Sequence, residues 1–271
     1  MRGAPVGGRL LWRSLGLALL LAPVSAAAVD GAGIVRDSLA RNPGYPFEYV
    51  VQSMVLIDRD GHRDVRRLRR YTRVERDGTI RILLRFTDPE AIRGTALLAR
   101  VAPNGAVHST IYLPALGGPM VAYRSSDRDG RFLGSDFAVA DLLPEQMADY
   151  RYRRLKDRVE GDDRWFVVEA RPRTPAVAQL TGYSRRLLFV RQDNRVIDRV
   201  DYFREGRLIK RLRRHDLRHV ALQGWVSDMV VMESFPERHR SILKTDSRIF
   251  GRDFVPPSLF DPAAISGHGP R

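Results

Sequence analysis

The stretch DGTIRILLRF at residues 77–86 joins a turn signal to a strand signal. Asp-Gly favours a tight hairpin turn because glycine accepts a positive φ angle, and the isoleucine, leucine and phenylalanine residues that follow favour extended backbone. The same pairing recurs along the chain, for example at Asn104-Gly105 ahead of VHSTIYL (107–113). This repetition predicts a series of antiparallel hairpins.

Further strands are expected at 164–170, 183–190, 195–203 and 225–235. Many of these segments alternate loosely between apolar and charged residues, so one face of the sheet should be dry and the other wet. Helical signals are sparse. They are found in GIVRDSLARN at 33–42 and in DFAVADLL at 136–143, where Asp136 is the expected N-cap and Pro144 the expected stop.

A large sheet with so few helices must bury its apolar face against itself. The fold class predicted is therefore mostly β (α+β), with a curled antiparallel sheet and short helices that plug the open mouth. A curled sheet of this kind can enclose an apolar cavity for one small or chain-like ligand.

The first 28 residues have the three parts of a secretory signal peptide. Three arginines precede a leucine-rich run at 15–21, and AAA at 26–28 supplies small residues for cleavage. An uncleaved N-terminal anchor is the alternative. No linker or repeat divides the rest, so we expect a signal peptide at 1–28, a single domain at 29–265 and a flexible tail at 266–271.

The chain carries 46 basic and 32 acidic residues and no cysteine. The absence of cysteine excludes disulfides, thiol catalysis and a lipid-modified cysteine. Such a basic chain often binds nucleic acid, but export argues against that partner. An exported basic surface instead favours transient contact with anionic lipid head groups, beside the simpler alternative of a solvated arginine surface.

Serine and aspartate residues gather in YRSSDRDGRFLGSDF at 123–137, which invites a catalytic interpretation. A serine nucleophile needs a general base, and no histidine lies in this stretch. Ser241-Ile-Leu-Lys244 matches Ser-x-x-Lys but lacks the accompanying motifs. No catalytic residue is therefore nominated, and an exported hydrolase that uses unidentified carboxylates stays a remote alternative.

Metal ligands are equally hard to assemble from the sequence. Asp-Arg-Asp-Gly occurs at 58–61 and 127–130 without the later oxygen donors of a calcium loop, so hairpin turns explain both copies. His215 and His219 would lie about 13 Å apart along a strand, too far to share one zinc ion. We expect neither a metal nor a cofactor.

Several sequence blocks, taken together in order, resemble one known family. FTDPEAIRGTALL (86–98), IYLPAL (111–116), SSDRDGRFLGSDF (125–137) and GWVSDMVVMES (224–234) are similar to the LolA-like outer-membrane lipoprotein-sorting family, in the branch that includes a spirochaete membrane lipoprotein. The likeness runs from about residue 33 to residue 265. It implies an incomplete, strongly bent antiparallel β-barrel with helices over its concave face, and no catalytic residues.

The resemblance also implies a function: carrying lipid or the acyl chains of lipoproteins through the periplasm toward the outer membrane. An inner-membrane transporter and an outer-membrane acceptor would be the implied partners. A non-catalytic module that senses lipid or accompanies a transporter is the alternative. Because aromatic and methionine side chains line cavities as well as fill cores, we name as candidate lipid-binding residues Leu97, Tyr112, Leu113, Leu116, Phe132, Phe137, Leu142, Trp165, Trp225 and Met232.

Overall fold

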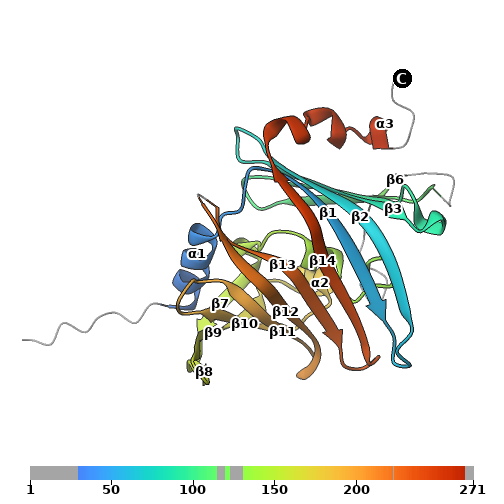
Figure 1. Cartoon of the computed structure of the whole chain (residues 1–271). Coiled ribbons are helices and arrows are strands. Elements are labelled where there is room, and N and C mark those ends of the chain that lie inside the picture. Colours follow the sequence, from blue (N-terminus) through green and yellow to red (C-terminus); the bar gives the residue numbers. More distant parts are fainter. Residues whose placement is uncertain (1–29, 115–119, 123–130, 222, 266–271) are drawn as a thin grey trace, which may run out of the picture.

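The computed structural model describes residues 30–114, 120–122, 131–221 and 223–265 (Figure 1). One antiparallel sheet of 14 strands runs in the order β6-β5-β4-β3-β2-β1-β14-β13-β12-β11-β10-β9-β7, with β8 paired to β9. The strands are β1 (Phe47–Ile57), β2 (Arg63–Val74), β3 (Ile80–Asp88), β4 (Ala96–Val101), β5 (Val107–Tyr112), β6 (Met120–Ala122), β7 (Tyr150–Arg154), β8 (Arg158–Glu160), β9 (Asp163–Pro172), β10 (Arg185–Arg191), β11 (Ile197–Arg204), β12 (Arg207–Val220), β13 (Gly224–Ser234) and β14 (His239–Phe250).

The helices are few and short, as the sequence predicted. They are α1 (Gly31–Arg41), α2 (Pro175–Thr181) and α3 (Pro262–Ile265), with 3₁₀ turns η1 (Glu90–Ile92), η3 (Phe132–Gly134), η4 (Val139–Leu142), η5 (Met147–Asp149), η6 (Arg252–Phe254) and η7 (Pro257–Phe260). None of the helices in the described part of the chain is both long enough and apolar enough to cross a membrane.

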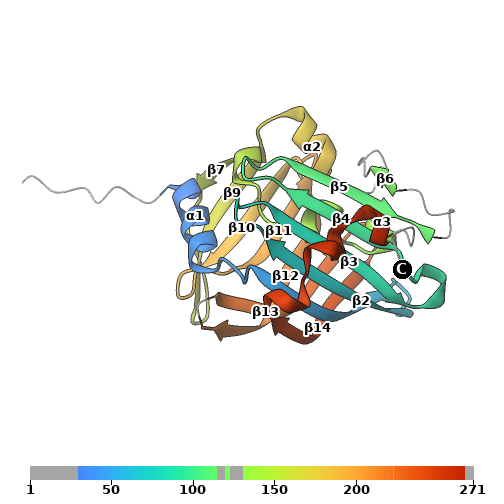
Figure 2. The ribbon, with the colours of Figure 1, turned by 90° about the horizontal axis from the view of Figure 1, so that it is seen from above.

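The sheet bends round a common interior without closing (Figure 2). Chain order and sheet order run together through β1–β6 and again through β9–β14, so most neighbours are joined by hairpins, and β14 pairs with β1 to unite the two halves. The expected fold class, an incomplete and strongly bent antiparallel barrel, is confirmed.

Alternation along the strands builds the core on the inner face. In β1, Val50, Gln52, Met54 and Leu56 are buried while the intervening side chains are not. This period of two is what a half-buried strand requires. Leu68 of the neighbouring strand β2 joins the same cluster.

Helix α1 packs closely against β7 at one end of this interior. The Asp30 carboxylate accepts a hydrogen bond of 2.6 Å from the Gly33 amide and caps the helix, and Ile34 and Val35 are buried. A Cβ added at Gly31 would lie 2.7 Å from the Arg154 amide nitrogen, so only glycine permits this approach. The helix expected at 33–42 therefore exists and begins two residues earlier.

The helix expected at 136–143 is wrong. Within this segment only Val139–Leu142 is helical, as the 3₁₀ turn η4, and its N-cap position is Ala138. The turn η3 precedes the segment and ends at Gly134, whose φ of +75° lies outside the right-handed helical region, so the two turns do not join into one helix. Asp136 does not cap a helix because its carboxylate is hydrogen-bonded to a distant strand, as described below.

The C-terminal segment covers part of the convex face, outside the barrel (Figure 1). Val255, Phe260 and Ile265 from this segment are buried against Leu83 of β3 and Ala96 of β4. Because neighbouring residues in a strand face opposite sides, β3 and β4 contribute to this outer cluster and to the inner core at once.

Candidate functional site

A cavity of about 930 Å³ lies between the inner face of the sheet and the segments that cover it. Strands β5 and β10–β13 form much of its wall, and the ends of α1 and α2 and the segment from η4 to η5 complete it. Its volume is at the upper end of the range of about 300–1,000 Å³ found for small-molecule sites. The apolar lining residues are Leu39, Val107, Val139, Leu143, Leu180, Leu188, Val196, Ile197, Val200, Leu212, Leu217 and Trp225.

The floor of the cavity contains an apolar row that crosses three strands. Leu188 of β10 pairs with Val200 of β11, and Val200 pairs with Leu212 of β12. These residues lie directly opposite one another in register, so their side chains share the inner face. We refer to Leu188, Val200 and Leu212 as the apolar row.

On one side of the apolar row lies an ion pair. Arg186 donates hydrogen bonds of 3.0 and 2.7 Å to the two carboxylate oxygens of Glu145, and Tyr152 donates one of 2.5 Å to the same group. Burial alone would raise the pKa of Glu145, but the charge and hydrogen bonds of Arg186 outweigh it and lower that pKa. The cavity wall therefore holds a matched pair of charges here.

A second carboxylate holds the covering segment in place. Asp141 accepts hydrogen bonds of 2.8 Å from the Ala138 amide and 2.8 Å from the Tyr183 hydroxyl. Burial raises the pKa of Asp141, against the opposing effects of nearby Lys210 and of these hydrogen bonds. Asp141 thus connects the N-cap amide of η4 to Tyr183, which lies just before β10.

Asp136 belongs to a buried polar group that we call the Asp136 cluster: Asp136, Lys210, His239 and Ser241. Its Oδ2 accepts a hydrogen bond of 2.8 Å from the Ser241 hydroxyl and lies 2.6 Å from Nδ1 of His239. The Asp136 amide donates to the Ser241 oxygen at 2.9 Å, and the Lys210 ammonium donates to the Asp136 carbonyl at 2.9 Å. These bonds join the loop between η3 and η4 to strands β12 and β14.

Serine, histidine and aspartate meet in this cluster, but not in a catalytic order. His239 and Ser241 both contact the same oxygen of Asp136, whereas a catalytic triad places the histidine between the other two. Ser241 is fully buried, and Lys244 of the Ser-x-x-Lys match is exposed on the other side of β14. The arrangement is suited to fixing a loop, not to acyl transfer.

The candidate lipid-binding residues lie in different environments. Trp225 lines the cavity. Five others lie in the inner core, each 5% exposed or less: Leu97, Phe132, Phe137, Leu142 and Met232.

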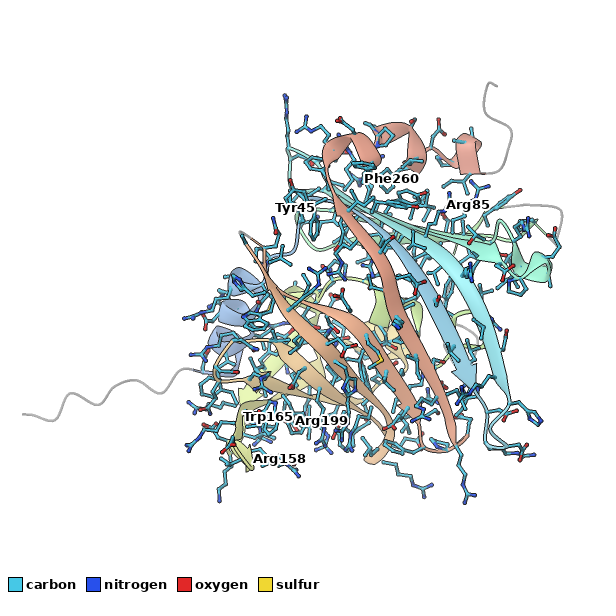
Figure 3. All side chains as sticks on the ribbon, viewed as in Figure 1. Tyr45, Arg85, Arg158, Trp165, Arg199 and Phe260 are labelled. Carbon is cyan, nitrogen blue, oxygen red and sulfur yellow. The ribbon has the colours of Figure 1, made fainter. Side chains whose placement is uncertain are left out.

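The remaining candidates are found elsewhere or fall outside the described residues. Tyr112 packs against the outer cluster beneath the C-terminal segment, and Leu113 is partly buried after β5. Trp165 lies on the convex side near Arg158 and Arg199 (Figure 3), and its indole nitrogen donates a hydrogen bond of 2.8 Å to Asp198. Leu116 is not among the described residues.

Sequence reasoning missed the apolar row and the two arginines that line the cavity, Arg186 and Arg214. A usable signal exists, since each arginine stands two residues from a buried leucine on the same strand, Leu188 or Leu212. A charged residue at the inward-facing position of a strand is rare enough to mark a site.

The turn between β1 and β2 offers the one candidate metal site among the described residues. One ligand atom each from Asp58, Asp60 and His62 lies within 4.8 Å of the others. The Asp58 carboxylate already accepts hydrogen bonds of 2.9 Å from the amides of both Asp60 and His62, which is how an aspartate stabilises a hairpin turn. The turn explains the three residues without an ion.

Crystal structures of three bacterial proteins share this fold. One is a domain assigned to outer-membrane lipoprotein sorting from Vibrio parahaemolyticus, with 23% identity, a TM-score of 0.78 and coverage of 87% of this chain and 98% of that one. A DUF1329 family protein from Desulfovibrio piger has 19% identity, a TM-score of 0.77 and coverage of 87% and 97%. A LolA superfamily protein from Nitrosomonas europaea has 19% identity, a TM-score of 0.66 and coverage of 86% and 98%.

Sequence comparison points the same way. None of the curated proteins matches the chain. Residues 78–266, more than half of the chain, match a protein-family model described as "-like: Uncharacterized protein". The chain therefore belongs to the family that this model describes, and it shares its fold with the lipoprotein-sorting domain and the LolA superfamily protein.

Proposed function

We propose that this protein is a non-catalytic periplasmic carrier that encloses an acyl chain of a lipid or lipoprotein and moves it toward the outer membrane. The observation that carries the proposal is the apolar row of Leu188, Val200 and Leu212 on the floor of a cavity of about 930 Å³. Trp225, one of the residues that the sequence suggested as lipid contacts, lines this cavity.

An apolar cavity lowers the free-energy cost of moving an acyl chain through water. Each methylene group exposed to water costs about 0.8 kcal/mol, so a chain of about 16 methylenes costs about 13 kcal/mol. A carrier lowers this cost by offering apolar walls in place of water. Release remains feasible when the acceptor binds the chain at least as well as the carrier does.

The names of the similar proteins support a role in carrying lipoproteins, since two of them refer to lipoprotein sorting or to LolA. The signal peptide expected at 1–28 would deliver the domain at 29–265 to the periplasm. In this proposal an inner-membrane transporter loads the cargo, an outer-membrane acceptor receives it, and the arginine-rich surface makes transient contact with the membrane. The buried position of Ser241 supports a non-catalytic role.

The test is lipid transfer between vesicles. Fluorescent phospholipid and an acylated peptide are loaded into donor vesicles, and their appearance in acceptor vesicles is followed with and without the mature protein. We expect stoichiometric binding and protein-dependent transfer. Binding without transfer would favour the lipid-sensing module, and the absence of both would overturn the carrier proposal.

A pair of variants links the result to the cavity. Val107 lines the cavity from β5, so Val107→Trp fills part of it and should weaken binding of both cargoes at least tenfold, about 1.4 kcal/mol. Val65, on β2, is 51% exposed, so Val65→Trp adds the same side chain outside and should bind like the unmodified protein. Equal binding by the two variants would place the lipid elsewhere.

A further inference from the structure

The two arginines that line the cavity differ in their partners. Arg186 forms a two-pronged ion pair with Glu145 through its two terminal nitrogens. Arg214 of β12 donates a hydrogen bond to the backbone carbonyl of Ile197, and within the described ranges no carboxylate forms an ion pair with it. Of the two cavity arginines, Arg214 is therefore the one without an ion-pair partner among the described residues.

The register of the sheet separates these two arginines. Arg186 pairs with Tyr202, which pairs with Lys210, and this polar row lies on one side of the apolar row. Arg214 follows Leu212 by two residues and so lies on the other side, about 13 Å along β12 from Lys210. The apolar floor thus ends at a positive charge.

The carboxylates of the cavity are engaged away from Arg214. Glu145 is bonded to Arg186 and Tyr152, and Asp141 to Tyr183 and the Ala138 amide. Asp149 also lines the cavity, and the charges that act on it are those of Glu145 and Arg186. The charges of Asp198 and Glu145 act on Arg214, but neither of these carboxylates forms an ion pair with it, and both are hydrogen-bonded to other residues.

A guanidinium in this position is incomplete without an anion. Arginine stays protonated in proteins and carries five N–H donors, so one backbone carbonyl cannot satisfy it. Burial lowers the pKa of Arg214, which reflects the cost of holding the charge away from water. Carboxylate and phosphate groups are the anions whose geometry matches a guanidinium fork.

Arg214 also lines a smaller hollow of about 360 Å³ on the outer side of the sheet, which contains Arg158, Arg191 and Asp198. Residue Arg214 therefore borders both the apolar interior and a polar, charged hollow.

We propose that Arg214 binds the anionic head group, carboxylate or phosphate, of an amphiphile whose chain fills the cavity. The proposal rests on the proposed function, because it assigns the polar end of the same lipid site. It predicts a preference for anionic chains over neutral chains of equal length.

The test compares laurate, dodecyl phosphate and dodecanol, each titrated against the mature protein by displacement of a fluorescent apolar probe. A hydrogen bond to a charged group contributes about 1.5–3 kcal/mol, so the anionic chains should bind roughly 10- to 100-fold more tightly than the alcohol. Tighter binding of laurate than of dodecyl phosphate would identify the head group as a carboxylate. Tighter binding of dodecyl phosphate than of laurate would identify it as a phosphate.

Variants assign the preference to Arg214. Arg214→Gln should lose most of the preference while dodecanol binding stays within about twofold. Arg214→Lys keeps the positive charge and should therefore keep part of the preference for anionic chains. Arg207 is exposed at the start of β12 and lines neither the cavity nor the outer hollow, so Arg207→Gln is the matched control and should behave like the unmodified protein.

The outcomes are distinct. Equal binding of all three chains, or a preference that survives Arg214→Gln, would overturn the assignment of Arg214 and leave the carrier intact. Failure of every chain to displace the probe would overturn the carrier proposal together with this one.

Discussion

Ser241 shows how much one buried hydroxyl can hold together. It donates to the carboxylate of Asp136 and accepts from the Asp136 amide, so it satisfies two groups in a loop that lies 105 residues away in sequence. A buried polar atom that loses its partner bears the full cost of its desolvation. The position of the loop over the core therefore depends on this side chain.

Ser241→Ala should lower the free energy of unfolding by about 1–3 kcal/mol, because the Asp136 amide and carboxylate would each lose a partner. Urea denaturation followed by tryptophan fluorescence measures this change. Ser247→Ala, at an exposed site on the same strand, is the control and should change stability by less than about 0.5 kcal/mol. A similar loss in the two variants would mean that the Asp136 cluster contributes nothing specific.

At the residue level, the sequence suggested that Asp136 was important but assigned it the wrong partner. An aspartate ahead of a short apolar run is a common helix N-cap, but the N-cap of η4 is Ala138, whose amide donates a hydrogen bond to Asp141 inside the turn. Nothing local distinguishes the two, because Ser241 and His239 approach Asp136 only when β14 is in place.

At the scale of elements, three strands share one carboxylate on the convex face. Glu169 of β9 forms ion pairs with Arg153 of β7, Arg171 of β9 and Arg185 of β10. The hydrogen bond from Arg171, together with those from Arg153, lowers the pKa of Glu169 despite its burial. The group offsets the repulsion that so many arginines would otherwise create across these strands.

A lowered carboxylate pKa fixes the sign of a pH effect. Glu169 stabilises the fold at pH values above the usual glutamate pKa of about 4.3, and this contribution is lost as the pH falls through its lower folded-state value. Glu169→Gln should therefore be destabilising at neutral pH, with a deficit that shrinks in acid. Thermal unfolding of both proteins from neutral to acidic pH tests this.

The control for this profile is Glu90→Gln, since Glu90 is 81% exposed and contacts a single arginine. Its stability should follow the unmodified protein at every pH. A Glu169→Gln deficit that stayed constant with pH would contradict the electrostatic explanation.

Close contact between α1 and β13 depends on a second glycine. A Cβ at Gly224 would lie 2.3 Å from the Arg41 carbonyl oxygen and 2.8 Å from the Asn42 side-chain oxygen. That Asn42 oxygen accepts a hydrogen bond of 2.9 Å from the Trp225 amide, next to the cavity. The end of α1 is thus positioned by the absence of a side chain.

Gly224→Ala should displace the end of α1 and destabilise the protein by more than the roughly 1–2 kcal/mol that a positive φ angle costs alanine. Gly206→Ala isolates the conformational part, since Gly206 has a φ of +80° and no atom within 4 Å of an added Cβ. Hydrogen exchange of the α1 amides and urea denaturation distinguish the effects of the two substitutions. Equal effects in the two variants would show that the close approach is unimportant.

At the scale of the whole molecule, the sheet is covered on both sides, by the segments over the cavity and by the C-terminal segment over the convex face (Figure 3). Phe260 is 3% exposed and packs in the outer cluster, whereas Phe254 of the same segment is 50% exposed. The C-terminal segment should therefore contribute to the stability of the sheet through Phe260.

Phe260→Ala should lower the free energy of unfolding by about 3–5 kcal/mol, the usual cost of removing a buried phenylalanine. Phe254→Ala, six residues earlier at an exposed position, should change stability by less than about 0.5 kcal/mol. Differential scanning calorimetry measures both. A small effect of Phe260→Ala would mean that the segment only rests on the sheet.

The sequence by itself determined the class of this protein: hairpin turns, period-two strands, one real helix at the start and a curled antiparallel sheet. These follow from local signals, since turn residues and alternation act over neighbouring positions. Only the tertiary structure decided that Leu188, Val200 and Leu212 form one floor, that Arg214 ends it without a carboxylate, and that Ser241 holds Asp136. Register between strands and the folding of distant segments over the sheet place these groups together, and neither is encoded in any short stretch.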